Sequence, residues 1–91
     1  MAYTVILPSS AVRQLETLQK KEQIRLKKRI DALAENPYPS DVKKLKHSSS
    51  FKGDLYRIRV GSFRVIYTIQ NDQLIIFVVK IGHRREIYQK L

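Results

Sequence analysis

Residues 55–67, LYRIRVGSFRVIY, constrain the fold of this sequence more than any other stretch. Residues alternate in character on both sides of Gly61-Ser62, a pair that suits a two-residue turn in which glycine supplies the positive φ. That turn sets the register of a β-hairpin in which Arg59 faces Arg64. One face of the hairpin is then apolar and expected to cover helices; it contains Tyr56, Ile58, Val60, Phe63, Val65 and Tyr67. The other face is basic and contains Arg57, Arg59 and Arg64.

Two further strands are predicted around this hairpin. Asn71-Asp72 offers a second tight turn, and residues 74–81 are almost continuously apolar, which is typical of a central strand buried on both faces. These segments complete a three-stranded antiparallel meander. Residues 2–7, AYTVIL, are β-branched and apolar, so we expect a fourth strand at one edge of the sheet.

Two helices are predicted between the first strand and the meander. Ser9 and Ser10 are suited to capping a helix, and apolar residues recur at near-helical spacing over residues 11–33. One continuous helix of that length would be roughly 40 Å long, whereas a globule of this size has a radius of gyration of about 12 Å. We therefore predict two antiparallel helices that separate at residues 19–22, where no apolar residue continues the stripe. Ile24 lies outside the stripe.

A long connection follows the second helix. Asn36-Pro37-Tyr38-Pro39 ends that helix, because proline disfavours helical geometry in the residue before it. Residues 36–54 then lack a regular pattern, and connections of this length tend to be functional or mobile. Two interpretations stay open, a solvated loop pinned to the core by Val42 or Leu45, or a loop that contacts phosphate groups. Its basic side chains are Lys43, Lys44, Lys46, His47 and Lys52.

The chain is expected to form one domain over residues 1–91. A core drawn from 91 residues, 43% of them hydrophobic, is only modestly larger than the minimum that folds unaided. The predicted fold is α+β, with two N-terminal antiparallel helices packed on one face of a four-stranded, mainly antiparallel sheet. A short basic tail or helix is expected at the C-terminus.

The charge of the chain indicates a polyanionic partner. The formal net charge is +10, and residues 41–91 hold 11 Lys and Arg against 4 Asp and Glu, so the C-terminal half is the expected contact surface. Nucleic acid, an acidic protein or an anionic membrane surface would each suit this charge. The absence of cysteine excludes disulfides and thiolate metal sites. No signal peptide is evident and the longest apolar run is far too short to span a membrane, so a soluble cytoplasmic protein without a membrane partner is expected.

The basic face requires an explanation, because like charges directly opposite each other destabilise a sheet. The arginines either spread into solvent or pair with Asp54, Asp72 or Glu86, or they surround an anion. The four carboxylates of residues 41–91 are scattered, which does not support a two-metal nuclease. No nucleophilic serine motif or glycine-rich phosphate loop is present. What remains is a phosphate site that needs neither metal nor cofactor.

The tail, Gly82-His83-Arg84-Arg85-Glu86-Ile87-Tyr88, returns basic groups to the same region. Guanidinium groups with a nearby phenol suit RNA cleavage by the substrate's own 2′-hydroxyl, where the protein aligns the attack and stabilises charge on the phosphoryl oxygens. Arginine grips two oxygens and stays protonated. Tyr88, which neighbouring cations would push toward phenolate, is the candidate base, and Arg84 or His83 would assist the departing 5′-oxygen.

The runs LYRIRVGSFRVIY, VKKLK and IGHRREIY resemble the RelE/ParE superfamily of type II toxins, which share a RelE-like, microbial ribonuclease-like fold. Members of the RelE branch cut mRNA in the ribosomal A site and are neutralised by a tightly bound antitoxin. The resemblance therefore implies mRNA, the ribosome with its RNA, and a cognate antitoxin as partners, with a monomeric free toxin that assembles further through the antitoxin. The implied catalytic residues are Arg57, Arg59, Arg64, Arg84 and Tyr88. Further RNA-binding candidates are Lys43, Lys44, Lys46, Lys52, His83 and Arg85.

The sequence departs from some RelE members, which have lysines at the positions of Arg57 and Arg59. Charge stabilisation carries over to these arginines, but a proton-transfer role does not. Two alternative functions stay open. One is the ParE branch, which shares the fold but targets DNA gyrase, and the other is a non-catalytic basic module that binds RNA or an acidic protein.

Overall fold

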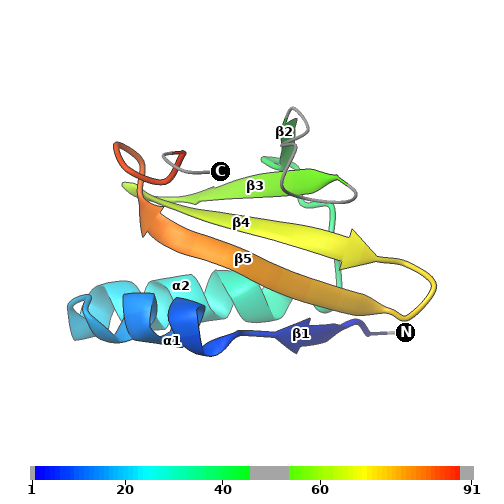
Figure 1. The fold of residues 1–91 in the computed structure, drawn as a ribbon, viewed down its shortest axis with the longest axis horizontal. Coiled ribbons are helices and arrows are strands. Elements are labelled where there is room, and N and C mark those ends of the chain that lie inside the picture. Colours follow the sequence, from blue (N-terminus) through cyan, green and yellow to red (C-terminus); the bar gives the residue numbers. More distant parts are fainter. Residues whose placement is uncertain (1, 46–53, 89–91) are drawn as a thin grey trace.

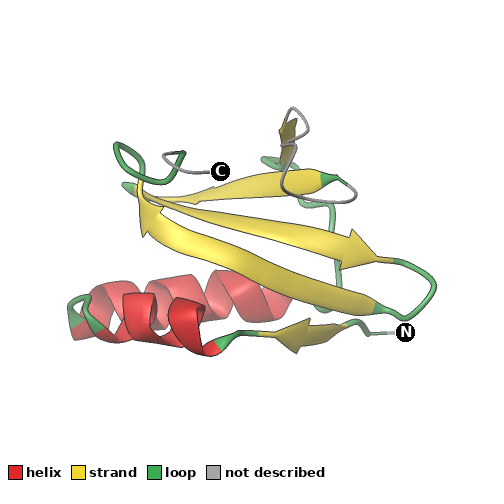
Figure 2. Ribbon diagram, in the orientation of Figure 1, coloured by secondary structure: helices red, strands yellow, loops and turns green. Residues whose placement is uncertain are grey.

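The computed structural model describes residues 2–45 and 54–88, which form a helical layer and a sheet (Figure 1). Helices α1 and α2 cover one face of the sheet, and the C-terminal turn of residues 84–88 lies on the other side (Figure 2). This is the predicted α+β arrangement. The elements in chain order are β1 (Thr4–Ile6), α1 (Ser9–Glu16), α2 (Lys20–Ala32), β2 (Lys43–Leu45), β3 (Leu55–Val60), β4 (Phe63–Gln70) and β5 (Ile75–His83).

The sheet has the order β1-β5-β4-β3-β2, with β1 parallel to β5 and the other pairs antiparallel. The predicted hairpin register is confirmed, since Arg59 pairs with Arg64 and Val60 with Phe63. Gly61 has φ +61°, the left-handed conformation that the turn requires of its first residue. The predicted edge position of the N-terminal strand is also confirmed, since β1 lies at one edge beside β5; the central strand of the sheet is β4.

The prediction of four strands is wrong, because the described sheet has five. The additional strand, β2, lies within the connection of residues 36–54 and pairs with β3, Lys43 opposite Arg57. A three-residue edge strand with two lysines has no alternation from which it could be predicted. It is extended because it forms hydrogen bonds with β3. Val42 and Leu45 pack against the two apolar clusters of the protein, as the pinned-loop interpretation expected. Residues 46, 47 and 52 lie outside the described part of the chain.

The two helices separate earlier than predicted. Residues 17–19 form the break and α2 begins at Lys20, whereas the sequence pattern placed the break at residues 19–22. The Gln23 side-chain Nε2 donates to the Leu18 carbonyl at 2.7 Å, a contact that the apolar pattern does not reveal. The capping prediction is also wrong. Pro8 occupies the N-cap without a side-chain hydrogen bond, and Ser9 is the first helical residue.

The third strand of the meander begins one residue later than predicted. Residues 71–74 form the loop, and Leu74 has φ +53°, so β5 starts at Ile75 and continues to His83. A register irregularity at Ile66 and Tyr67 interrupts the pairing of β4 with β5. Alternation of faces along this pair therefore shifts between its two ends.

Two apolar clusters hold the sheet from opposite sides. The helix-side cluster contains α-helical residues such as Leu26 and Ile30 together with Ile58, Val65 and Tyr67 of the sheet. The smaller cluster lies on the opposite face and contains Leu55, Ile66 and Ile87, with Leu45 and Val79 beside them. Because Ile87 is fully buried in this cluster, the C-terminal turn packs against the basic face of the hairpin. No helix in the described residues is long and apolar enough to cross a membrane.

Candidate active site

The structure places the three hairpin arginines on the sheet face opposite the helices, as predicted. Arg57 shares this face with its register partner Ile66, which belongs to the smaller apolar cluster. The three side chains differ in exposure: Arg57 is buried, with 7% of its surface accessible, Arg64 is partly buried and Arg59 is exposed. The face therefore has one largely desolvated cation beside two that are more open to solvent.

The hairpin turn holds Arg64 in place. Its Nη1 donates to the carbonyl oxygens of Gly61 and Phe63, both at 2.9 Å. These contacts satisfy one guanidinium nitrogen with backbone acceptors. The rest of this planar donor group is available to an anion.

The C-terminal turn brings Arg84 and Tyr88 to the same end of the sheet. The Arg84 amide donates to the Ser62 carbonyl at 2.8 Å, and the Ile87 amide donates to the His83 carbonyl at 3.0 Å. Burial of Ile87 then fixes the position of the following residue. Tyr88 is 46% exposed, so its phenol is accessible beside the hairpin.

Electrostatic interactions join all five predicted catalytic residues around Arg64. Burial lowers the pKa of Arg64, and the positive charges of Arg59, Arg57 and Arg84 lower it further, whereas Tyr88 raises it. Interactions of this kind require the groups to lie within a short range. Arg57, Arg59, Arg84 and Tyr88 are therefore each near enough to Arg64 to affect its charge; we call these five residues the basic cluster.

Within residues 2–45 and 54–88, no carboxylate forms an ion pair with a cation of the basic cluster. Ion pairs in the described ranges, 2–45 and 54–88, join Lys27 to Asp31, Arg29 to Asp41 and Lys44 to Asp54. The predicted alternative of pairing with Asp54, Asp72 or Glu86 is therefore not what the structure contains. Among the described residues, the buried Arg57 Nε has no hydrogen-bond partner. A buried polar atom without a partner is destabilising, and it lies among other cations, an arrangement that suits an anion.

The other predicted RNA-binding residues are distributed over several places. Lys43 lies opposite Arg57 in register and so shares its face, whereas Lys44 lies opposite Tyr56 and pairs with Asp54 at 3.2 Å. Arg85 is exposed in the C-terminal turn. Lys46 and Lys52 lie outside the described residues.

His83 does not join the basic cluster. It pairs in register with Phe63, and the two rings meet edge to face with centroids 5.9 Å apart. Phe63 packs on the helix-side cluster, so the histidine lies on the helix side of the sheet. Its Nδ1 accepts a hydrogen bond from the Arg85 amide at 3.2 Å. The hypothesis that His83 assists the departing oxygen is therefore not supported by its position.

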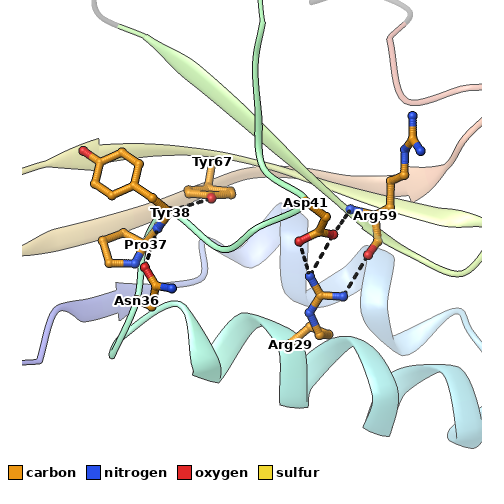
Figure 3. A network of polar contacts seen from close by, with 7 residues as sticks. All are labelled: Arg29, Asn36, Pro37, Tyr38, Asp41, Arg59 and Tyr67. Carbon is orange, nitrogen blue, oxygen red and sulfur yellow. Dashed lines mark hydrogen bonds and ion pairs between the residues drawn. The ribbon is translucent and has the colours of Figure 1, made fainter.

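A polar network beneath the cluster was not predicted (Figure 3). Arg29 of α2 donates from Nη2 to both carboxylate oxygens of Asp41, at 2.9 and 3.0 Å, and from Nη1 to the Arg59 carbonyl at 3.0 Å. Burial raises the pKa of Asp41, but the hydrogen bonds and charge of Arg29, with the Arg59 amide, outweigh it and the pKa falls. The sequence gives no signal for this network, because it depends on the register of β2, which places Asp41 opposite Arg59.

The same region contains a buried tyrosine. The Tyr67 hydroxyl donates to the Pro37 carbonyl at 2.8 Å, which ties the end of the helical layer to the sheet (Figure 3). Burial raises the pKa of Tyr67 well above its ordinary value. No group of three or more His, Asp or Glu residues that could hold a metal ion is found within residues 2–45 and 54–88.

Comparisons with known proteins establish the family of the chain and its fold. Residues 5–88 match the family described as ParE toxin of type II toxin-antitoxin system, parDE. The chain belongs to the RelE/ParE superfamily of type II toxins. It is 33% identical over 92 residues to the putative toxin RelE1 of Methanocaldococcus jannaschii, covering 98% of both chains.

Solved structures of RelE proteins share the fold of this RelE-like toxin. The RelE-RelB complex of Pyrococcus horikoshii is similar with a TM-score of 0.80 and 32% identity, covering 94% of this chain and 99% of the matched one. The isolated RelE toxin of Escherichia coli has a TM-score of 0.72 at 21% identity, covering 90% and 84%. The second likeness concerns the fold alone.

Proposed function

We propose that this RelE-like toxin is an endoribonuclease that cuts mRNA in the ribosomal A site and so inhibits translation. The observation that carries the proposal is the buried Arg57, whose Nε lacks a partner while Arg59, Arg64 and Arg84 surround the same place. Four cations without a carboxylate are poorly suited to a structural role, because each repels the others. A phosphodiester would provide the missing negative charge and acceptor oxygens.

The proposed reaction uses the RNA's own 2′-hydroxyl as nucleophile. Tyr88 accepts the proton of that hydroxyl, and the 2′-oxygen attacks the adjacent phosphorus. The bond to the 5′-oxygen breaks, and this oxygen takes up a proton from water while Arg84 donates a hydrogen bond to it. The products are a 2′,3′-cyclic phosphate and a 5′-hydroxyl. No metal ion or cofactor is needed for any of these steps.

The arginines have different parts in this scheme. Arg57 and Arg64 bind the non-bridging phosphoryl oxygens, whose charge increases in the transition state. Arg64 is held by two backbone carbonyls, so little reorganisation is needed when the phosphate arrives. Arg59 is exposed and would contact the incoming strand, with Lys43 next to it. All of these groups act by charge and hydrogen bonding, because arginine does not readily release its proton.

A cognate antitoxin is the proposed regulatory partner. Structural relatives of this chain include RelE proteins solved in complex with RelB antitoxins. An acidic antitoxin segment over the basic cluster would neutralise its charge and exclude RNA. The matched family is named after ParE, which favours inhibition of DNA gyrase as the second candidate function.

The test is cleavage of mRNA on programmed ribosomes by the purified toxin. We expect Arg64→Ala to slow single-turnover cleavage by about 100- to 1,000-fold and Tyr88→Phe by about 100- to 10,000-fold. Lys27→Gln, which removes an exposed cation from α2, should cut like the wild type. Intact ribosomal mRNA together with gyrase-dependent DNA breaks would refute the ribonuclease and support the second candidate.

A further inference from the structure

We propose that Arg29 and Asp41 are positioning residues that hold Arg59 in the basic cluster by completing an unfinished edge of the sheet. We call this pair the Arg29–Asp41 clamp. Its catalytic meaning rests on the proposed function, whereas its effect on the Arg59 backbone does not.

Strand β2 is too short to cover β3. It pairs Leu45 with Leu55 and Lys43 with Arg57, and begins at Lys43. In an antiparallel ladder the backbone groups of every second residue point to the same neighbour, so those of Arg59 point to the side where β2 has not yet begun. An unpaired amide and carbonyl at this edge would leave the strand end poorly ordered.

The clamp provides the missing partners. Continuing the register of β2 by two residues places Asp41 opposite Arg59, but residues 40 and 41 form a turn. The Asp41 carboxylate accepts from the Arg59 amide at 3.4 Å, and Arg29 donates to the Arg59 carbonyl at 3.0 Å. Two side chains therefore replace the backbone of one strand residue. Both contacts, and the direct pair between Arg29 and Asp41, are visible in Figure 3.

Fixing these backbone groups fixes the direction in which the Arg59 side chain leaves the strand. Its guanidinium extends away from Arg29 and Asp41 (Figure 3), toward the face that it shares with Arg64. The two arginines are directly opposite each other, and their repulsion favours a splayed strand end. The clamp, which is anchored on helix α2 through Arg29, holds the strand end against this repulsion. A small displacement of a charge-stabilising group has a large effect on rate, so we expect the clamp to contribute to catalysis.

A merely structural ion pair is the competing explanation. Arg29 and Asp41 are each more than a third exposed, and pairs of this kind contribute little to stability. A structural pair would change unfolding without changing the rate of the folded enzyme. Coupling to Arg59 distinguishes the two explanations, because only a positioning pair acts through that side chain.

The first experiment measures saturating single-turnover cleavage on programmed ribosomes, corrected for the folded fraction. Asp41→Asn and Arg29→Gln should each lower the maximal rate by about tenfold or more, and Arg29→Lys should restore part of it. In an Arg59→Ala background the same changes should have almost no further effect. Matched controls are Asp31→Asn, which breaks an exposed ion pair on α2, and Lys28→Gln, which removes a cation from the same helix. An equal loss with and without Arg59 would overturn the proposal.

The second experiment does not depend on activity. Amide hydrogen exchange of the free toxin should show the Arg59 amide exchanging about tenfold faster in Asp41→Ala, with the Val60 amide, which points toward β4, unchanged. Asp41→Asn replaces this variant if Asp41→Ala does not fold. An unchanged Arg59 amide overturns the clamp. If the wild type cuts no mRNA, the proposed function fails, and the exchange result still decides whether the clamp orders Arg59.

Discussion

Replacing Arg57 with methionine should stabilise the toxin while abolishing its activity. Arg57 is 7% exposed, its Nε has no partner, and the neighbouring cations of the basic cluster repel it. Methionine keeps the unbranched shape and adapts to irregular gaps. Beside Ile66, the register partner of residue 57 on β4, a thioether is better accommodated than an uncompensated charge.

The expected gain follows from the buried charge. Leaving a buried polar group unsatisfied costs about 1–3 kcal/mol, and an imperfect fit of the new side chain removes up to about 1.5 kcal/mol. The free energy of unfolding should therefore rise by about 1 kcal/mol, within a range of about −0.5 to +3 kcal/mol set by the two terms. For a domain of this size each kcal/mol raises the unfolding midpoint by about 4–8 °C. Cleavage should fall by about 100-fold or more, because a phosphate-binding donor is lost.

Urea and thermal unfolding of the free toxin measure this effect, with Arg59→Met as the matched control. Arg59 lies on the same strand and face but is exposed, so its replacement should change the free energy of unfolding by less than about 0.5 kcal/mol. If Arg57→Met is no more stable than Arg59→Met, the buried cation is not uncompensated. Arg57 would then not be part of a site prepared for an anion.

Three further changes test other parts of the structure. Ile87→Ala removes a fully buried side chain and should lower the free energy of unfolding by about 2–4 kcal/mol. It should also slow cleavage, because Tyr88 loses its position. An unchanged cleavage rate per folded molecule would contradict this role of Ile87. Tyr67→Phe leaves the Pro37 carbonyl without its donor and should cost about 1–2 kcal/mol in thermal unfolding; an unchanged midpoint would contradict this role. The lowered pKa of Asp41 means that its pair adds stability above the unfolded-state value, near 3.9, and loses it as pH falls through the folded-state value. Urea unfolding of Asp41→Asn should therefore be less sensitive to pH below about 4 than that of the wild type, and equal sensitivity would contradict the assignment.

The hairpin was predictable because its determinants are local. Gly61 sets the turn, the turn sets the register, and the alternation of residues 55–67 then assigns every side chain to a face. The like-charge pair of Arg59 and Arg64 follows from these local rules. Their catalytic roles, and those of Arg84 and Tyr88, stay predictions until cleavage is measured.

Strand β2 and the position of His83 were not predictable, for two different reasons. Strand β2 depends on hydrogen bonds to β3 rather than on a pattern of its own. His83 lies in the same short basic run as Arg84, but its pairing with Phe63 turns it to the helix side. The partner of Ile66 is Lys80 and that of Tyr67 is Val78, so β5 has one extra residue that shifts its alternation of faces. Counting along the chain could therefore not assign His83 to a face.

Local chemistry in the chain specified the hairpin, the two helices, the excess of positive charge and the family to which this toxin belongs. Long-range contacts specified the surroundings of the arginines of the candidate site: the burial of Arg57, the return of the C-terminal turn through Ile87, and the contacts of Arg29 and Asp41 with Arg59. The physical reason is that turns and alternation act between neighbouring residues. Desolvation and charge repulsion depend on which distant segments the folded chain brings together.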